Sequence, residues 1–190
     1  MPPRDAPAPL FMAPLELENE AARLEILHAL QILDTKPEST FDDVVQAVSR
    51  CLDVPIALVS LVGSDRQWFK ARVGLEIEQT PRDVSLCGHA IHHRKMFLVS
   101  DAARDLRFAL NPLVLRGPKI RAYAGAVLSL PRAHGIGTLC AIDTRPRAFT
   151  HDQLFQLRRL ADFVETVFAV RSRTGILSTQ TDHDDQVLPG

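Results

Sequence analysis

The chain has 190 residues, 46% of them hydrophobic, and its 22 Lys and Arg residues nearly balance its 23 Asp and Glu residues, which leaves a formal net charge of -1. This length and hydrophobic content predict one compact domain with a single core and some tail. A net charge this small gives no overall electrostatic reason to expect nucleic acid or an anionic membrane as the main partner.

The first half of the chain predicts a tail, two helices and a hairpin. Residues 1–18 are rich in proline and alanine, which predicts a disordered N-terminal tail without a signal-peptide segment. Apolar residues at helical spacing predict a helix over 19–35, with Asn19 as N-cap, and a second helix over 39–52. A β-branched run and an alternating run flank a Gly-Ser-Asp turn, which predicts a β-hairpin over 55–73.

The second half predicts another hairpin between helices. The expected elements are a short helix over 84–94, a strand over 96–100, an irregular segment over 101–119, strands over 120–130 and 136–143, a helix over 150–171 capped by Thr150, and a mobile tail over 172–190. Hairpins combined with helices predict an α+β domain with a central antiparallel sheet over residues 19–171.

The strongest local signal for chemistry is Ser-Leu-Cys-Gly-His-Ala-Ile-His-His at 85–93. On a helix, His89 and His93 share a face, whereas Cys87 and His89 diverge. A tetrahedral zinc site would need further ligands, and the sequence offers no convergent Cys or His pair to supply them. The pattern therefore predicts no metal site.

Cys87 is also a candidate for thiol chemistry, because a thiolate is stabilised near the start of a helix. His89 is only two residues away, which is a poor position for a hydrogen bond between a nucleophile and its base. The other cysteines, Cys51 and Cys140, are distant in the sequence, and no Cys-x-x-Cys pair occurs. This usage argues against a disulfide framework and a zinc ribbon, and it favours reduced thiols in a cytoplasm, with Cys87 buried and inert.

A ligand pocket is the third interpretation. The 101–119 segment is long for a connection in a compact domain, and such segments often act as lids. The candidate lining residues are Ser85, Cys87, His89, Asp101, Asn111, Arg121 and Tyr123. Plain packing with surface charge pairs explains the same residues equally well. In the strand expected over 120–130, Arg121 and Tyr123 share one face. The small residues Ala122, Ala124 and Ala126 lie on the other face and leave room either for a ligand or for close helix packing.

Several motifs in this order resemble the GAF domain, a small-molecule-sensing module, and specifically its bacterial subfamily found ahead of histidine kinases and diguanylate cyclases. The matching stretches are 20–45, 54–91, 105–114, 121–128 (RAYAGAVL) and 137–147 (GTLCAIDTRPR). The resemblance implies a central antiparallel sheet with the first and last helices packed together on one side. It places a ligand pocket on the other side, under the short helix and the irregular segment.

The resemblance also implies a homodimer formed through the terminal helices, although the apolar stripe of 154–168 suits packing on its own sheet equally well. The sequence lacks the full motifs of three other activities found among GAF domains: cyclic-nucleotide binding, bilin binding and methionine-sulfoxide reduction. The cyclic-nucleotide motif is absent, and Gly88 separates Cys87 from His89, whereas bilin-binding members place Cys directly before His. The free methionine-(R)-sulfoxide reductases, which SLCGHA resembles, need partner cysteines that residues 74–84 and 100–120 lack. The sequence does not identify a cofactor.

The sequence thus favours a cytoplasmic, non-catalytic GAF sensor that binds a small molecule. We expect no nucleic-acid partner and no membrane partner, since no apolar run is long enough to span a bilayer. Few residues follow Arg171, so we expect a sensor that acts in trans on a histidine kinase or cyclase, is cut from a larger signalling protein, or has lost its output domain. The alternatives are a redox enzyme of the methionine-sulfoxide type that uses Cys87, and a ligand-free dimerisation module.

Overall fold

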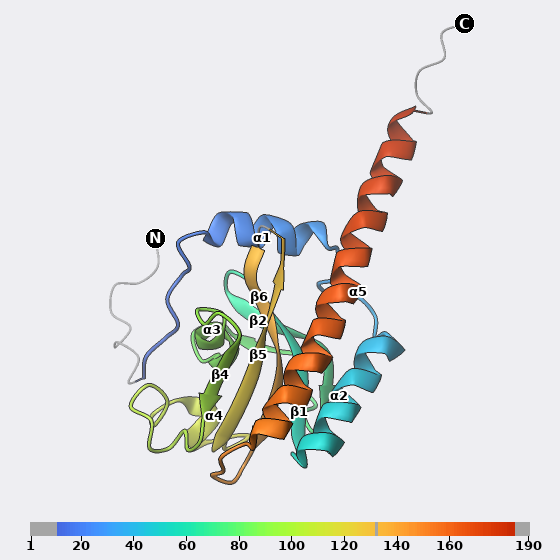
Figure 1. The fold of residues 1–190 in the computed structure, drawn as a ribbon. Coiled ribbons are helices and arrows are strands. Elements are labelled where there is room, and N and C mark those ends of the chain that lie inside the picture. The colour runs from blue at the N-terminus through green and yellow to red at the C-terminus, as the bar shows by residue number, and fades with distance from the viewer. Residues whose placement is uncertain (1–10, 132, 185–190) are drawn as a thin grey trace, which may run out of the picture.

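The computed structural model describes residues 11–131 and 133–184 (Figure 1). Its centre is a six-stranded sheet of order β3-β2-β1-β6-β5-β4 in which every neighbouring pair is antiparallel. The strands are β1 (Ile56–Val62), β2 (Arg66–Val73), β3 (Gln79–Pro81), β4 (Met96–Val99), β5 (Ala122–Leu130) and β6 (Ala133–Asp143). The helices are α1 (Glu20–Ala29), α2 (Ser39–Leu52), α3 (Leu86–Ala90), α4 (Pro112–Leu115) and α5 (His151–Asp184). The α+β prediction is confirmed.

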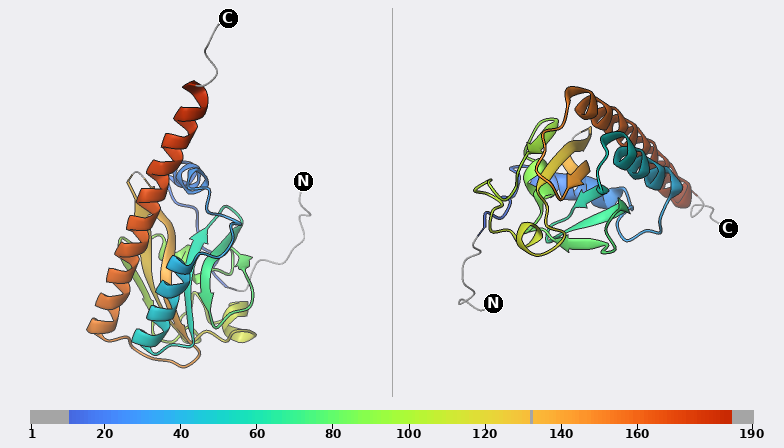
Figure 2. Two further views of the ribbon diagram at one scale, coloured as in Figure 1. Left: turned by 90° about the vertical axis from the view of Figure 1, so that its right-hand side faces the viewer. Right: turned by 90° about the horizontal axis from the view of Figure 1, so that it is seen from below.

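The two faces of the sheet carry different layers. Helices α2 and α5 lie side by side on one face, while α3 and the irregular segment that holds α4 cover the other (Figures 1 and 2). Because side chains alternate along a strand, neighbours in β6 serve different faces: Leu139 belongs to the core under α2 and α5, and Cys140 to the core under α3. Strand β1 is buried at every position, as a strand covered on both faces requires.

Helix packing decides between the two roles that the small residues of β5 could have. Ala124 and Ala126 are fully buried in the same core as Leu157, Ala161 and Val164 of α5. Their small side chains let the helix approach the strand closely, so they serve helix packing rather than a ligand. The apolar stripe of α5 likewise packs on its own sheet, and the capping box at its start is confirmed, since the Gln153 N–H lies 3.3 Å from the Thr150 hydroxyl.

Several predicted boundaries differ from the observed ones. The first helix ends at Ala29 instead of continuing to residue 35, and α3 spans Leu86–Ala90 rather than 84–94. Strand β6 begins at Ala133, inside the expected turn, and the short strand β3 was not anticipated. The last helix was expected to end at Arg171 but continues to Asp184, so part of the predicted mobile tail is helical.

The arrangement of the terminal helices also differs from the expectation. The first helix was expected to pack with the last, but it is α2 that lies against α5, and α1 runs across the end of the sheet against β6 (Figure 1). The chain before α1 was expected to be disordered. Residues 11–18 instead lie along the α3 side of the domain, where the Met12 N–H donates to the Arg107 carbonyl at 3.3 Å. The start of that predicted tail, residues 1–10, lies outside the described residues.

Among residues 11–131 and 133–184, no helix combines the length and the apolar character needed to cross a membrane.

Candidate functional site

The site under α3 begins with the cap of that helix. Ser85 is fully buried in an extended conformation, and its hydroxyl accepts the Gly88 N–H at 2.8 Å. The same hydroxyl donates to the side-chain oxygen of Gln67 on β2. Ser85 therefore starts the helix and ties it to the sheet, which is a structural reason for a polar residue at this position.

Two thiols meet beneath this helix. Cys87 on α3 is 2% exposed and Cys140 on β6 is 0% exposed, and their Sγ atoms lie 4.0 Å apart. The Tyr123 hydroxyl lies 3.4 Å from Cys87 Sγ and 3.4 Å from Thr138 Oγ1. The expectation that Cys87 has no thiol partner is wrong, because strand pairing brings a cysteine from a distant part of the sequence to the same buried spot.

Gly125 makes room for the tyrosine in this arrangement. A Cβ atom at Gly125 would lie 2.3 Å from the Tyr123 hydroxyl oxygen and 2.7 Å from its Cε1. The Tyr123 ring therefore lies over the glycine and follows strand β5, which directs its hydroxyl toward Cys87. Gly125 pairs with Cys140 in the β5–β6 register, so the glycine and both thiols belong to one small region of the sheet.

Electrostatics distinguishes the two sulfurs. Hydrogen bonding from the Cys140 thiol, followed by hydroxyl groups that include that of Tyr123, lowers the pKa of Cys87 to about 6 against the opposing effect of burial. Burial raises the pKa of Cys140 well above its usual value, and a Cys87 thiolate beside it acts in the same direction. A negative charge is therefore favoured on Cys87 rather than on Cys140. Burial also raises the pKa of Tyr123, which keeps its hydroxyl a proton donor.

A second set of polar groups continues the network from the thiols to the far strand. The Gln67 side chain donates from Nε2 to Thr80 Oγ1 at 2.7 Å, and its oxygen accepts from Ser60 at 3.4 Å as well as from Ser85. All four side chains are buried, and each has a partner. A satisfied buried network of this kind holds one arrangement of strands and helix.

The space beside this network is small. A cavity of about 20 Å³ lies between α3, the sheet and the 112–120 segment, which is room for little more than one water molecule. Its walls are formed by Leu58, Gln67, Phe69, Leu75, Ile77, Thr80, Leu86, Cys87, Leu113, Pro118, Ile120, Tyr123 and Ile142. The space under α3 and the irregular segment, where a ligand pocket was expected, is therefore filled by packed side chains.

The histidines of the 85–93 stretch face the N-terminal segment instead of the cavity. His89 Nε2 lies 2.9 Å from the Met12 carbonyl oxygen, and His92 Nε2 lies 3.0 Å from that of Leu15. His93 stacks on Phe97 with ring centroids 4.7 Å apart. Within the part of the chain that the structure describes, no three Cys, His, Asp or Glu side chains converge as metal ligands would.

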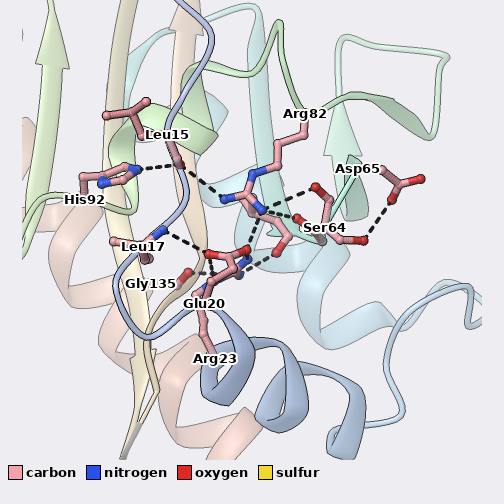
Figure 3. Close-up of polar contacts among 11 residues, drawn as sticks. Leu15, Leu17, Glu20, Arg23, Ser64, Asp65, Arg82, His92 and Gly135 are labelled. Carbon is pink, nitrogen blue, oxygen red and sulfur yellow. Dashed lines mark hydrogen bonds and ion pairs between the residues drawn. The ribbon is translucent and has the colours of Figure 1, made fainter. Parts of the chain in front are cut away.

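A buried ion cluster fixes the same N-terminal segment at the end of the sheet (Figure 3). Glu20 accepts hydrogen bonds from the guanidinium groups of Arg23 and Arg82 and, at 3.3 Å, from the Leu17 N–H. Arg23 is fully buried and donates to the Val62 carbonyl at 2.6 Å. Burial alone would raise the pKa of Glu20, but hydrogen bonds from Arg23 and Arg82 outweigh it and lower that pKa to about 2.

The remaining predicted site residues lie apart from the thiols. Asn111 is buried, caps α4 by accepting the Leu113 N–H at 2.9 Å, and donates to the Val84 carbonyl at 2.9 Å. Asp101 and Arg121 form an ion pair of 3.7 Å beside an open surface hollow of about 550 Å³. Of the seven candidates, the structure brings together Ser85, Cys87 and Tyr123, and it places the others elsewhere.

Sequence reasoning missed five members of the buried group. They are Ser60, Gln67, Thr80, Thr138 and Cys140. Alternation along β6 does put Thr138 and Cys140 on one face. Which face meets α3 depends on the strand order, which the sequence does not display.

Comparisons with known proteins agree with this architecture. A family model of the GAF domain matches residues 36–168. A cyclic di-GMP phosphodiesterase of Pseudomonas aeruginosa is 41% identical over 130 residues, which make up 68% of this chain and 22% of that protein. The chain therefore spans less than a quarter of the length of this relative.

Two solved structures illustrate the likeness in fold. The GAF domain of an Acinetobacter phosphoenolpyruvate-protein phosphotransferase superposes with a TM-score of 0.59 at 20% identity, over 77% of this chain and 92% of that one. The PixJ GAF domain of Thermosynechococcus elongatus gives a TM-score of 0.58 at 18% identity, over 84% and 95% of the two chains. At these identities the structures bear on the fold alone. Because the family model matches residues 36–168, well over half of the 190 residues, this chain belongs to the GAF domain family.

Proposed function

We propose that the chain is a non-catalytic, small-molecule-sensing module of a cytoplasmic signalling protein, and that α5 carries its signal. The observation that carries this proposal is the position of α5. The helix packs on the sheet face opposite to α3, runs for 34 residues, and extends beyond the sheet (Figure 1). A change under α3 that shifts the shared strands β5 and β6 therefore acts directly on the helix that leaves the domain.

The relative suggests the kind of output. It is named a cyclic di-GMP phosphodiesterase, and the similarity covers 22% of it. We infer that the present chain regulates a partner or an attached domain of that signalling class, with a histidine kinase as the other candidate. The chemistry of hydrolysis is then supplied by the output domain and not by this fold.

Ligand binding under α3 requires movement of the cavity walls. A volume of about 20 Å³ holds a water-sized molecule, whereas sites for larger ligands have roughly 300–1,000 Å³. The walls most able to move are Ile77, which is 48% exposed, and the 112–120 segment that carries Leu113 and Pro118. Binding that selects an opened state would reorganise this segment and the contacts of α3.

Thermal unfolding tests this proposal with defined probes: cyclic di-GMP, cyclic GMP, haem, a linear tetrapyrrole and free methionine. A probe present at roughly 100 times its Kd raises stability by about 2.7 kcal/mol, which corresponds to a shift of about 5–10 °C in Tm for a domain of this size. Leu113→Ala enlarges the cavity and should change that shift. Leu106→Ala is the matched control, because Leu106 lies in the irregular 101–119 segment, which also contains Leu113, but is 93% exposed.

Native mass spectrometry of protein purified from its own host provides the independent readout. A bound mass that survives in the Leu106→Ala protein and changes in the Leu113→Ala protein supports the site. The bare protein mass, together with no stabilisation by any probe, would contradict small-molecule sensing.

The dimerisation alternative has its own observation. Phe155 and Phe163 are 61% and 48% exposed on the side of α5 that faces away from the sheet. We infer that this side pairs with a second copy of the chain. Light scattering should report a dimer, and Phe163→Glu should shift the mass toward the monomer, while Leu106→Glu, at a 93% exposed position on the other side of the sheet, serves as a charge control. A monomeric mass of the unmodified protein at all concentrations would rule this out.

A further inference from the structure

We propose that Cys87 and Cys140 form a dithiol site for small hydroperoxides, in which Cys87 is oxidised first and Cys140 then closes an intramolecular disulfide between α3 and the centre of the sheet. This inference goes beyond the proposed sensing of a ligand and does not depend on it. The oxidant is the only small molecule that it requires.

The geometry of the two sulfurs suits this reaction. Their separation of 4.0 Å exceeds the length of an S–S bond by only about 2 Å. One sulfur belongs to a five-residue helix and the other to a central strand, so a side-chain rotation with a small shift of α3 can close the gap. Cys51 is exposed on α2, on the opposite face of the sheet, and takes no part.

The surroundings assign different roles to the two cysteines. Cys87 has the Tyr123 hydroxyl at 3.4 Å and the Cys140 thiol at 4.0 Å as donors that stabilise its thiolate. The thiolate is the nucleophilic form of cysteine, so Cys87 is the attacking group. Cys140 stays protonated and acts as the resolving thiol, which attacks the oxidised Cys87 sulfur.

Access also favours Cys87. The cavity of about 20 Å³ is lined by Cys87 and not by Cys140. Its volume admits a molecule near the size of water. Hydrogen peroxide is much closer to that size than any organic disulfide is. The fold thus selects both the attacking sulfur and the class of oxidant.

The reaction balances in two steps. The Cys87 thiolate attacks one peroxide oxygen, the O–O bond breaks, and Cys87 becomes a sulfenic acid as hydroxide leaves and takes up a proton to form water. The Cys140 sulfur then attacks the Cys87 sulfur, the S–O bond breaks, and a second water leaves with the Cys140 proton. Overall, two thiols and one hydrogen peroxide give one disulfide and two waters, and the two electrons pass from sulfur to peroxide.

The product would change the domain without any ligand. The new bond closes a loop of 53 residues and fixes α3 to β6, which also restricts the cavity wall. A loop of this length is among those whose closure constrains the unfolded chain strongly. Oxidation should therefore raise Tm and slow exchange of the amide hydrogens in α3.

Mass spectrometry of the whole chain tests the site. Protein carrying Cys51→Ser, which removes the exposed thiol, is reduced, freed of reductant and treated with stoichiometric hydrogen peroxide. The expected result is the loss of two hydrogen atoms, protection of both thiols from alkylation in denaturant, where burial no longer shields them, and a nonreduced peptide pair that joins Cys87 to Cys140. Adding a thiol reductant should restore the starting mass.

Two matched variants in the same background separate the roles. Cys140→Ser should leave Cys87 to gain oxygen without forming the cross-link, and Cys87→Ser should show neither change. Mapping of the Cys51→Ser protein needs no substitution in the core, so the test stands even where a core variant fails to fold. Oxidised glutathione and free methionine sulfoxide serve as larger oxidants and should react far more slowly.

Three results would overturn the proposal. One is a protein with both thiols still open to alkylation after peroxide treatment. Another is a Cys140→Ser protein in which Cys87 gains no oxygen. The third is cross-linking by a larger oxidant but not by peroxide. Each is read from mass and peptide maps, so it is distinct from a failure of ligand sensing, which is read from thermal shifts with the probes above.

Discussion

The two faces of the central sheet hold their covering helices through different interactions. Under α2 and α5, the core is mainly apolar, and buried aromatic rings such as Phe41 and Phe168 meet with centroids 5.5 Å apart. One buried cation, Lys70, lies over the Phe41 ring at this face and pairs with Glu38 at 2.6 Å. Under α3, the same strands present thiols, hydroxyls and an amide that must all be paired. The first face supplies stability through area removed from water. The second specifies one arrangement and is therefore where small chemical changes can alter the fold.

Truncating a ring on the apolar face should have the largest effect on stability. Phe168→Ala removes a fully buried ring and should lower the free energy of unfolding by about 3–5 kcal/mol, because a cavity remains. Leu106→Ala on the opposite side of the sheet is the control, since Leu106 is 93% exposed, and it should change stability by less than about 0.5 kcal/mol. Denaturant unfolding measures both, and equal effects would show that α5 is not anchored by this face.

Breaking the ion cluster at the end of the sheet should have the next largest effect. Glu20→Gln leaves Arg23 buried without its carboxylate, which should cost about 3 kcal/mol. Glu25→Gln on the exposed side of α1 is the matched control. If both variants unfold at the same denaturant concentration, the cluster does not hold the N-terminal segment.

The same carboxylate gives a pH dependence of known sign. Folding lowers the pKa of Glu20 from 4.5 to about 2, so its contribution is fully present above pH 4.5 and is lost as the pH falls toward 2. The difference in unfolding free energy between the unmodified protein and Glu20→Gln should therefore shrink over this range. A difference that stays constant with pH would contradict the role of the charge.

Removing one hydroxyl from the polar face should have the smallest effect on stability but a specific effect on chemistry. Tyr123→Phe deletes the donor 3.4 Å from Cys87 and should cost about 1 kcal/mol. It should also raise the pKa of Cys87 from its value of about 6. The ultraviolet absorbance of the thiolate against pH, in a Cys51→Ser background, measures this shift, and an unchanged pKa would show that the tyrosine does not act on the thiol.

The sequence predicted the elements with clear periodicity. The apolar stripe of α2 and the hairpin of β1 and β2 stand as expected, because each depends on neighbours in the chain. The boundaries of α1 and α5 were misplaced. Helical spacing suggested that the first helix continues past Ala29, and the polar composition after Arg171 hid the continuation of α5 to Asp184. At such ends tertiary contacts and capping override the local pattern.

The site was predictable only in part, for the same reason. Ser85 and Cys87 are two positions apart in the sequence, within one of the stretches that resemble the family. Their partners come from two strands, Gln67 from β2 and Thr138 and Cys140 from β6, and meet only because the strands take the order β3-β2-β1-β6-β5-β4. No spacing rule reports a contact between residues 53 positions apart.

By itself, then, the sequence determined the class of fold, the elements and the family motifs, since alternation, helical stripes and turn residues are local properties. The tertiary structure decided the rest. Packed side chains leave a cavity of only about 20 Å³ where the ligand pocket was expected. His89 contacts the N-terminal segment, and Cys140 lies beside Cys87. The physical reason is that cavity volume, burial and sulfur–sulfur distance depend on how faces pack, and packing joins residues that the chain itself keeps far apart.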